Sequence, residues 1–290
     1  MHEETRKVHR RAVLWGVLTA SLLLTCGCTW VRRTSEVQPL SSPARRIVSL
    51  APNATEVLFA LGAGSQVVAC TNACNYPPQV RGLPRVGDVH IDPERVVAVA
   101  PDLVVAEWLT PDEAVSRLQS LGLRVLRLDS STLDGYFCTL RVLGAATGHA
   151  IEAERLRTSL EATLHARREH LRTLPRHERP RVFVEIWGRP LQTAANGTFI
   201  QEMVVLAGGI NVFEELEQYP QVSPEALVLR DPDVVLLTSS TPQEFTAQPA
   251  FRSLRAVRSG RVLAIEPDTL VRPGPRLSQA LDALCGALAR

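Results

Sequence analysis

Aromatic residues and surplus charge are both scarce in this sequence. Aromatic residues fill 5% of the 290 positions, and the formal net charge is only +2. A chain so close to neutral is not forced to carry a basic surface, so its composition gives no support for nucleic-acid binding. With 45% apolar and 21% charged residues the chain has the composition of a globular protein, and its length favours two lobes. Each aromatic residue outside a core is therefore worth following.

The sequence also lacks the short motifs of common enzymes and metal sites. It has no nucleophile elbow (G-x-S-x-G), no P-loop, no dinucleotide-binding fingerprint and no H-E-x-x-H pair. Its six cysteines form no C-x-x-C clusters, which argues against a structural zinc site. We therefore expect no catalytic residue, no resident cofactor and no metal site. An exported α/β enzyme of unknown reaction stays open as the alternative, because a fold of this class hosts many activities.

The apolar run near the N-terminus is too short to span a bilayer comfortably. A basic start precedes the apolar stretch Ala12–Leu24, which ends in the tetrapeptide TCGC. A small residue followed by cysteine at this point resembles a bacterial lipoprotein signal, in which the cysteine is acylated. We expect residues 1–28 to be a signal peptide with lipidation at Cys28; lipidation at Cys26 or plain secretion are the alternatives. The polar residues 29–44 are expected to tether an exported protein in the periplasm or at the outer face of the cytoplasmic membrane.

The most informative feature is an internal repeat. Its two copies, with the same spacing, are Pro93-Glu94 followed by Pro101-Asp102, and Pro224-Glu225 followed by Pro232-Asp233. In each copy we expect Asp92 or Ser223 to cap a short helix whose first turn holds the proline and the glutamate. The Pro-Asp pair then ends the helix and opens a buried apolar strand.

Short apolar strands alternate with helical segments in both halves, which predicts an α/β protein with parallel sheets covered by helices. The segment between the halves has no strand signal, and its later part has the spacing of one long amphipathic helix. We expect two Rossmann-like lobes joined by a single long backbone helix. The boundaries are 45–132 for the N-terminal lobe, 133–174 for the helical connection and 175–290 for the C-terminal lobe.

These segments resemble the periplasmic receptors for cobalamin and iron chelates. The resemblance covers most of residues 45–290 and rests on the stretches RIVSLAPNATEVLFALG, CNYPP, ERVVAVAPDLVVAEW, AANGTFIQEMVVLAGGINVF and YPQVSPEALVLRDPDVVLL. It implies the class III periplasmic binding protein fold. It also implies a monomeric receptor that captures a metal chelate for the membrane subunits of an ABC importer, with its cytoplasmic ATPase. CNYPP and the spacing from Asp268 to Arg272 are closer to the cobalamin-binding members. Cobalamin or a related corrinoid is thus the first expected ligand, and haem or a ferric siderophore is the alternative.

Four aromatic residues are candidates for the ligand site. Ligands of open α/β sheets bind beyond the carboxyl ends of the strands. Trp108 and Trp187 follow equivalent strands in the two halves, so we expect them to face one cleft. By the resemblance, Tyr76 packs against the corrin ring, and Tyr219 lies in a loop where related receptors often carry an aromatic ligand contact. Packing in a core or at a rim is the alternative for the two tryptophans, and packing of its own loop on the lobe is the alternative for Tyr76.

Three polar residues complete the expected ligand site. Asp268 and Arg272 lie in the loop after the last strand, where they can hydrogen-bond the amide fringe of a corrin. A surface ion pair is the alternative. His90 stands where the cobalamin-binding members carry an aromatic residue. In the ligand site, His90 would pack against the ligand, donate a hydrogen bond to it or coordinate cobalt or haem iron. The alternative is a histidine that is simply solvated.

Two further pairs stand outside the ligand site. Glu94 and Glu225 occupy equivalent first helical turns, and by the resemblance such a pair docks onto arginines of the membrane subunits. Stabilisation of the helix dipole is the alternative. Cys70 and Cys74 are close enough in sequence to form a local disulfide in an oxidising compartment, and two small buried thiols are an equally open interpretation.

Overall fold

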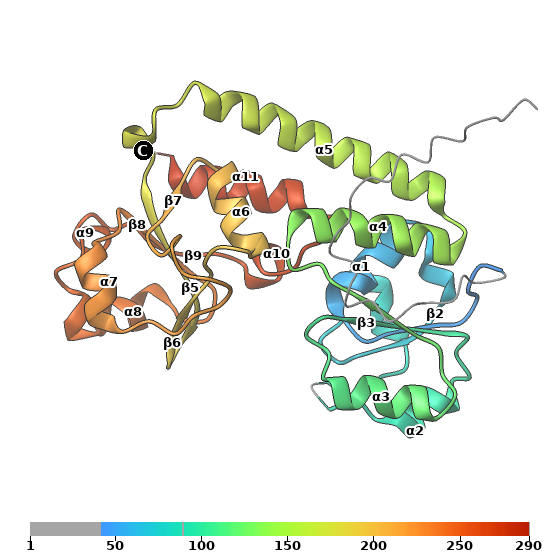
Figure 1. The fold of residues 1–290 in the computed structure, drawn as a ribbon. Helices are drawn as coiled ribbons and strands as arrows, with labels where there is room; N and C mark the ends of the chain where they lie inside the picture. The colour runs from blue at the N-terminus through green and yellow to red at the C-terminus, as the bar shows by residue number, and fades with distance from the viewer. Residues whose placement is uncertain (1–41, 89, 290) are drawn as a thin grey trace, which may run out of the picture. The chain divides into compact units, whose positions relative to one another are not determined.

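The computed structural model describes residues 42–88 and 90–289, which form two parallel-dominated sheets with helices around them (Figure 1). The N-terminal lobe has a four-stranded sheet in the order β2-β1-β3-β4, and the C-terminal lobe a five-stranded sheet in the order β6-β5-β8-β9 with β7 paired to β5. The strands are β1 Ile47–Ser49, β2 Val67–Cys70, β3 Leu103–Glu107, β4 Val125–Leu128, β5 Arg181–Gly188, β6 Leu191–Thr193, β7 Ile210–Asn211, β8 Val234–Leu237 and β9 Val262–Ala264.

Helices cover both faces of each sheet, and the alternation of strand residues decides which core each residue enters. In β3, Leu103 and Val105 pack in one cluster with α1 and α4, whereas Val104 and Ala106 pack in another with α2 and α3. The helices are α1 Pro52–Ala60, α2 Pro93–Ala98, α3 Asp112–Ser120, α4 Leu133–Thr147, α5 Ala150–Arg172, α6 Phe199–Leu206, α7 Pro224–Arg230, α8 Pro242–Ala247, α9 Arg255–Arg258, α10 Pro267–Leu270 and α11 Leu277–Leu288. The expected two-lobed α/β fold is confirmed.

The internal repeat appears as two equivalent helix–strand units. The Asp92 side chain accepts from the backbone N–H of Arg95 at the start of α2, and Ser223 accepts from Ala226 at the start of α7. Both predicted caps are therefore confirmed. Strands β3 and β8 that follow them occupy the same place in their sheets, each paired in parallel with the first strand of its lobe.

An arginine and an aspartate close each unit in the same way. The Asp102 carboxylate accepts from the backbone N–H of Arg46 at 3.0 Å, and Asp233 accepts from that of Arg181 at 2.9 Å. The same arginines reach back across the turn: Arg46 donates to the Val99 carbonyl and Arg181 to the Arg230 carbonyl, both at 2.7 Å. These contacts join the C-terminal end of the short helix to the sheet. They explain why the Pro-Asp pair recurs at a fixed spacing.

The helical connection expected over residues 133–174 contains two helices, and the second of them, α5, is the predicted long backbone helix. Gly148, at φ 81°, ends α4, and α5 then runs for 23 residues to Arg172. Helix α5 packs against α4 and also against α6 and α11 of the C-terminal lobe, as Figure 1 shows. Its buried residues are Ala153, Leu160, Leu164 and Leu171. A glycine that adopts the left-handed conformation without a side-chain penalty supplies the break between the helices.

Two details differ from the pattern expected from sequence. Strand β6 pairs antiparallel to β5, because the chain turns back at Arg189-Pro190 and forms a hairpin on an otherwise parallel sheet. Ala44, placed in the polar tether by the sequence analysis, is 2% exposed and donates from its backbone N–H to the Ala146 carbonyl at 2.8 Å. In the described ranges, no helix is both long and apolar enough to cross a membrane.

Candidate ligand site

One aromatic contact joins loops from the two lobes. Trp108 follows β3 and Tyr219 lies in the loop between β7 and α7; their ring centroids are 6.3 Å apart at an interplanar angle of 14°. Arg127 fixes the loop of Trp108 by donating to its carbonyl at 2.9 Å. Gln192, from β6, fixes the loop of Tyr219 by donating to its carbonyl at 2.8 Å. The site thus brings Trp108 and Tyr219 together, although Trp187 was the expected partner.

Two other predicted aromatic residues expose much of their surface. Trp187 is 56% exposed and Tyr76 is 42% exposed, which makes them two of the few large apolar side chains left open to solvent. The Trp187 indole N–H donates to the Arg189 carbonyl at 2.9 Å, so its polar edge is satisfied while its ring faces stay available. An aromatic ring that stays in contact with water does not contribute the stability that its burial would provide. Binding of a partner would bury these two rings and gain that free energy.

An arginine and a glutamate that the sequence analysis missed support Tyr76. The guanidinium carbon of Arg276 lies 4.5 Å from the centroid of the Tyr76 ring. Glu56 of α1 holds this guanidinium with two hydrogen bonds of 2.6 and 2.8 Å, and Arg272 lies 3.7 Å from the same carboxylate. The Glu56 side chain is only 2% exposed. The one sequence signal for this network is that Arg276 stands four residues after Arg272.

Asp268 and Arg272 form an ion pair with a third member. Their closest contact is 2.6 Å, and the two side chains are 27% and 14% exposed. Asn75 completes a triangle, because its amide donates to Asp268 at 2.6 Å and its carbonyl oxygen accepts from Arg272 at 2.6 Å. The triangle ties the Tyr76 loop to the segment after β9. Both charged residues are thus already paired to each other, which limits their capacity to neutralise a charged ligand.

A buried carboxyl group lies directly behind Trp108. Glu107 is 4% exposed and accepts from Asn53, from the Ser130 hydroxyl at 2.8 Å and from the Ser130 backbone N–H. Burial raises the pKa of Glu107 to about 7, although the hydrogen bonds from Ser130 and Asn53 oppose the shift. Sequence reasoning did not single out this group, because nothing in the pattern LVVAE distinguishes a buried glutamate from an exposed one.

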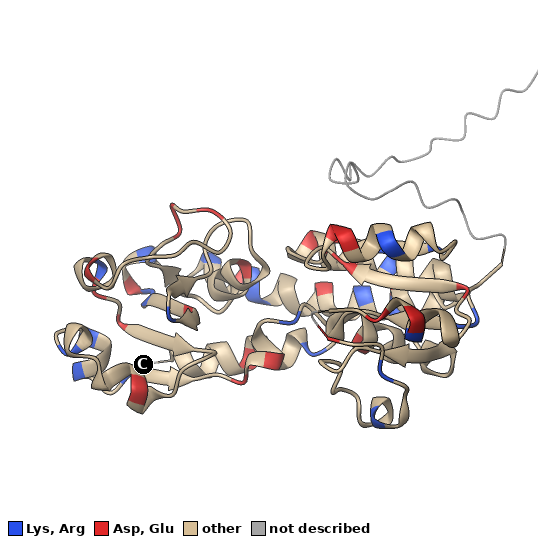
Figure 2. Ribbon diagram, turned by 90° about the horizontal axis from the view of Figure 1, so that it is seen from below, with Lys and Arg blue, Asp and Glu red and all other residues tan. Residues whose placement is uncertain are grey.

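The remaining predicted residues lie on the surface. His90 is exposed beside the one undescribed loop position, residue 89, and Glu94 and Glu225 are exposed on the first turns of α2 and α7. Hydrogen bonds from its own backbone N–H and from Ser223 lower the pKa of Glu225. A groove of about 400 Å³ lies beside Glu225, between α7 and Ala250, and Leu229 at its edge is 84% exposed. Acidic and basic residues occur in both lobes (Figure 2).

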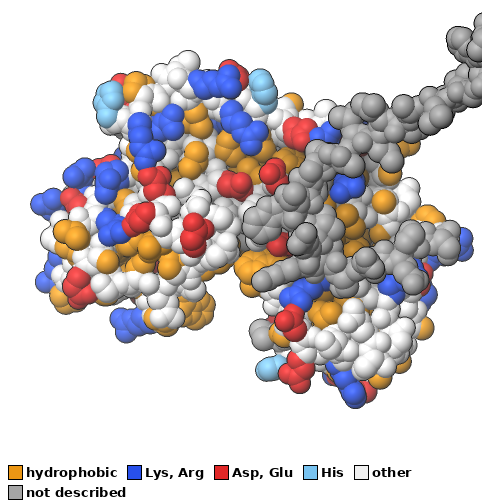
Figure 3. Space-filling view, viewed as in Figure 1, with side chains coloured by type: hydrophobic (Ala, Val, Ile, Leu, Met, Phe, Trp, Pro, Cys, Tyr) orange, Lys and Arg blue, Asp and Glu red, His pale blue; other side chains and the backbone are white. Residues whose placement is uncertain are grey.

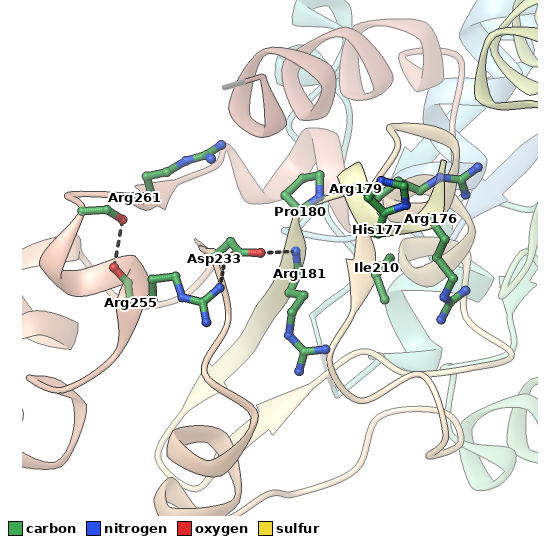
Figure 4. Close-up of a pocket in the computed structure, with 10 residues that line it drawn as sticks. Arg176, His177, Arg179, Pro180, Arg181, Ile210, Asp233, Arg255 and Arg261 are labelled. Atoms are coloured by element: carbon green, nitrogen blue, oxygen red, sulfur yellow. Dashed lines mark hydrogen bonds and ion pairs between the residues drawn. The ribbon is translucent and has the colours of Figure 1, made fainter. Parts of the chain in front are cut away.

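A larger cavity, of about 880 Å³, lies at the amino ends of the strands in the C-terminal lobe, opposite the carboxyl ends where the ligand site was expected. Its lining includes five arginines, His177 and Asp233, and Figure 3 shows basic side chains gathered over this part of the surface. Figure 4 shows that the guanidinium groups of Arg176, Arg181 and Arg261 point in different directions. Arg181 and Arg261 also donate to backbone carbonyls. The cavity is therefore not a convergent anion site, and it is remote from the carboxyl end of β5 that carries Trp187.

Some predicted features lie outside the described residues. These are the signal peptide, Cys28 and Cys26, and the tether up to residue 41. Within residues 42–88 and 90–289, no group of three or more His, Cys, Asp and Glu side chains is arranged to hold a metal ion.

Comparison with known proteins gives consistent matches over most of the chain. A family model described as periplasmic binding protein matches residues 47–269. An ABC transporter substrate-binding lipoprotein of Bacillus subtilis, itself uncharacterised, is 27% identical over 96% of this chain and 97% of its own length. The vitamin B12-binding protein of Vibrio cholerae is 31% identical over 89% of this chain and 94% of its own.

Solved structures agree with these relatives. The periplasmic vitamin B12-binding protein structure from Vibrio cholerae superposes with a TM-score of 0.73 at 30% identity, covering 85% of this chain and 97% of that one. A periplasmic haem-binding protein from Roseiflexus superposes with a TM-score of 0.75 at 28% identity, covering 84% and 98%. The chain is thus similar both to a protein named for vitamin B12 and to one named for haem.

Proposed function

We propose, from the premise that this chain belongs to the periplasmic binding protein family, that it captures cobalamin or a closely related corrinoid for import. The role of substrate-binding protein of an ABC importer is common to the chain and its relatives. This chain binds the ligand and delivers it to the membrane permease, through which the ligand crosses the membrane, and the ATPase supplies the energy. The relatives named for vitamin B12 support this ligand.

The aromatic surfaces carry the proposal. Trp108 and Tyr219 reach toward one another from the two lobes, while Tyr76 and Trp187 keep their rings exposed. A flat macrocycle held between two rings needs about 3.5–4 Å of contact distance on each side, or roughly 7–8 Å in all. The observed centroid distance of 6.3 Å is about an ångström too short for that sandwich. The two rings must therefore move apart by at least about an ångström before such a ring can lie between them.

The pairing of the charged groups favours a neutral or amide-rich ligand over an anionic one. Arg272 is held by Asp268, Asn75 and the nearby Glu56, and Arg276 is held by Glu56. A strongly anionic siderophore has to compete with these carboxylates for the same guanidinium groups. Amide groups at the edge of a corrin need only single hydrogen bonds, which an existing ion pair can still provide.

Tryptophan fluorescence provides the first test of the ligand. A chain that begins at Thr34 retains only Trp108 and Trp187 as reporters. We expect cobalamin to quench this emission saturably after correction for absorbed light. We expect Trp108→Ala and Trp187→Ala each to weaken binding at least about tenfold, since buried aromatic contacts dominate such sites.

Leu109→Ala is the matched control for that titration, because Leu109 adjoins Trp108 and is 73% exposed. It should bind like the parent chain. Saturable quenching by haem or a ferric siderophore in place of cobalamin would keep the receptor role and replace the ligand. An absence of response to all three chelates would contradict the site.

We further propose that Glu94 and Glu225 dock the receptor onto basic residues of the permease. The glutamates are exposed at equivalent positions of the repeat, and the exposed Leu229 and its groove adjoin one of them. Anchorage through a lipid on Cys28 and a monomeric state complete the proposal, and the relative named as a lipoprotein supports the anchor.

Charge reversal separates docking from ligand capture. The double variant Glu94→Arg, Glu225→Arg should lose cobalamin uptake in cells that depend on this receptor, while its affinity for the ligand stays within about twofold of the parent. Glu113→Arg, which reverses an exposed charge on the first turn of α3, is the control and should support normal uptake. Normal uptake by the double variant would rule out these two residues as the docking pair.

A further inference from the structure

Cys70 and Cys74 lie together at the base of the loop that carries Tyr76. Cys70 ends β2, where its backbone N–H donates to the Pro84 carbonyl and its carbonyl accepts from Val86. The chain then turns, and the Cys74 N–H donates to the Thr71 carbonyl at 3.1 Å. This turn brings Cys74 back to Cys70, so that the two thiols, both free, share one small buried cluster with Val80. Neither cysteine has any exposed surface.

The groups around the two sulfurs favour a thiolate on Cys74. Its Sγ lies 3.1 Å from the Thr55 hydroxyl, which donates to it, and 3.2 Å from the Thr71 hydroxyl. A hydrogen bond from Cys70 is the largest cause that lowers the pKa of Cys74, to about 6, and the hydrogen bonds from Thr55 and Thr71 act in the same direction. The hydrogen bond to Cys74 is also the main reason why the pKa of Cys70 is raised. In the closed turn Cys70 therefore keeps its proton and donates a hydrogen bond to the Cys74 sulfur.

Arg85 adds a fixed cation to this arrangement. Its Nη1 donates to the Cys70 sulfur at 3.0 Å and to the carbonyls of Thr71 and Cys74 at 2.7 and 2.8 Å. The guanidinium charge opposes the rise in the pKa of Cys70, and its hydrogen bonds to the two carbonyls hold both ends of the turn together. The backbone turn and the Arg85 side chain thus both hold the two thiols close to each other.

We propose that Cys70 and Cys74 are an oxidation site, and that in the exported protein they form a disulfide that locks the turn below Asn75 and Tyr76. The thiolate of one cysteine attacks one sulfur of a disulfide-bearing thiol oxidant and releases the first thiolate of that oxidant. The other cysteine then gives up its proton and attacks the cysteine sulfur of the mixed disulfide, which releases the second thiol. The protein loses two electrons and two protons, and the oxidant is reduced to two thiols.

Burial determines when this bond forms and how long it lasts. Both sulfurs are inaccessible in the folded chain, so exchange takes place while the turn is open, during or soon after export. Once the turn has packed under Phe59 and Leu83, the same burial shields the bond from reductants. Cys138 and Cys285 are partly exposed and belong to separate helices, so they provide free-thiol references within the same molecule.

The test is peptide mapping of the full chain recovered after export from a bacterial host. Thiols are blocked with an alkylating reagent in denaturant, with or without prior reduction, and the chain is then cut after arginine. Residues 47–81 form one peptide that contains Cys70 and Cys74 and no other cysteine, while Cys138 and Cys285 fall in two other peptides. We expect the 47–81 peptide to be lighter by two hydrogens and unalkylated until it is reduced. The two reference peptides should be alkylated directly.

Direct alkylation of both Cys70 and Cys74 in the unreduced sample would overturn the proposal, and so would a bond from either residue to Cys138, Cys285 or a small thiol. The variant Cys70→Ser provides the matched control, because Cys74 should then react without reduction. Reduction of the parent chain should also lower its melting temperature by a few degrees, an effect absent in Cys70→Ser. Neither readout involves a ligand, so the result is independent of the proposed function.

Discussion

Replacing Glu56 with alanine should lower the free energy of unfolding by about 3–5 kcal/mol, because the substitution leaves buried positive charge uncompensated. Glu56 is the shared partner of Arg272 and Arg276, whose side chains are only 14% and 16% exposed. Water cannot replace the lost carboxylate at such positions without opening the contact between α1 and the segment before α11. Denaturant unfolding followed by circular dichroism measures the change.

An exposed ion-pair cluster gives the matched control for this prediction. Arg157 of α5 pairs with Glu154 and Glu161, and the three side chains are 31% to 61% exposed. Arg157→Ala should therefore cost less than about 1 kcal/mol. The combination Glu56→Met with Arg276→Met should recover part of the loss, because it removes charges on both sides. If Glu56→Ala costs no more than Arg157→Ala, the network does not stabilise the contact between α1 and the segment before α11.

The fold was predictable because it depends on short-range signals that repeat. The caps Asp92 and Ser223, the prolines that follow them and the apolar runs after each Pro-Asp pair all specify structure locally. Helix α6 likewise begins at Phe199 because Thr198 caps it. The hairpin to β6 was not predictable in the same way. It depends on the chain turning back at Arg189-Pro190 after β5, so that β6 pairs antiparallel with β5. No hydrophobic periodicity in the sequence indicates such a turn.

The candidate site was predictable in its residue types but not in its contacts. Trp108 and Trp187 were predicted to face one cleft because each follows a strand. The ring that stacks on Trp108 is instead that of Tyr219, which lies in a loop. Glu56 and Arg276 are separated by 220 positions, and their ion pair exists only because α1 meets the residue that precedes α11 in the folded chain. Sequence spacing identifies neighbours within an element, whereas a contact of this kind requires the tertiary arrangement.

The stability of the protein should fall as the pH rises from about 4.5 through about 7, and Glu107→Gln should abolish this part of the pH dependence. Burial raises the pKa of Glu107 from its ordinary value of 4.5 to about 7. Between these two values the unfolded chain has lost the proton that the folded chain still binds, so each increase in pH favours unfolding. Above both values the accumulated loss is about 3 kcal/mol, given 1.36 kcal/mol for each pKa unit.

Glutamine fits the site without ionising. Its amide nitrogen can take the place of Oε1 and donate to the Ser130 hydroxyl and, with the Asn53 amide turned over, to the Asn53 side-chain oxygen. Its carbonyl oxygen can still accept from the Ser130 backbone N–H. Melting temperatures of the parent chain and of Glu107→Gln, measured at intervals from pH 5 to pH 9, should diverge as the pH rises, with the variant the more stable above neutrality. Glu152→Gln, which changes an exposed glutamate on α5, should follow the parent curve. Parallel curves for the parent chain and Glu107→Gln would mean that Glu107 is ionised at the same pH whether the chain is folded or not, and Asn53 and Ser130 would then compensate its burial in full.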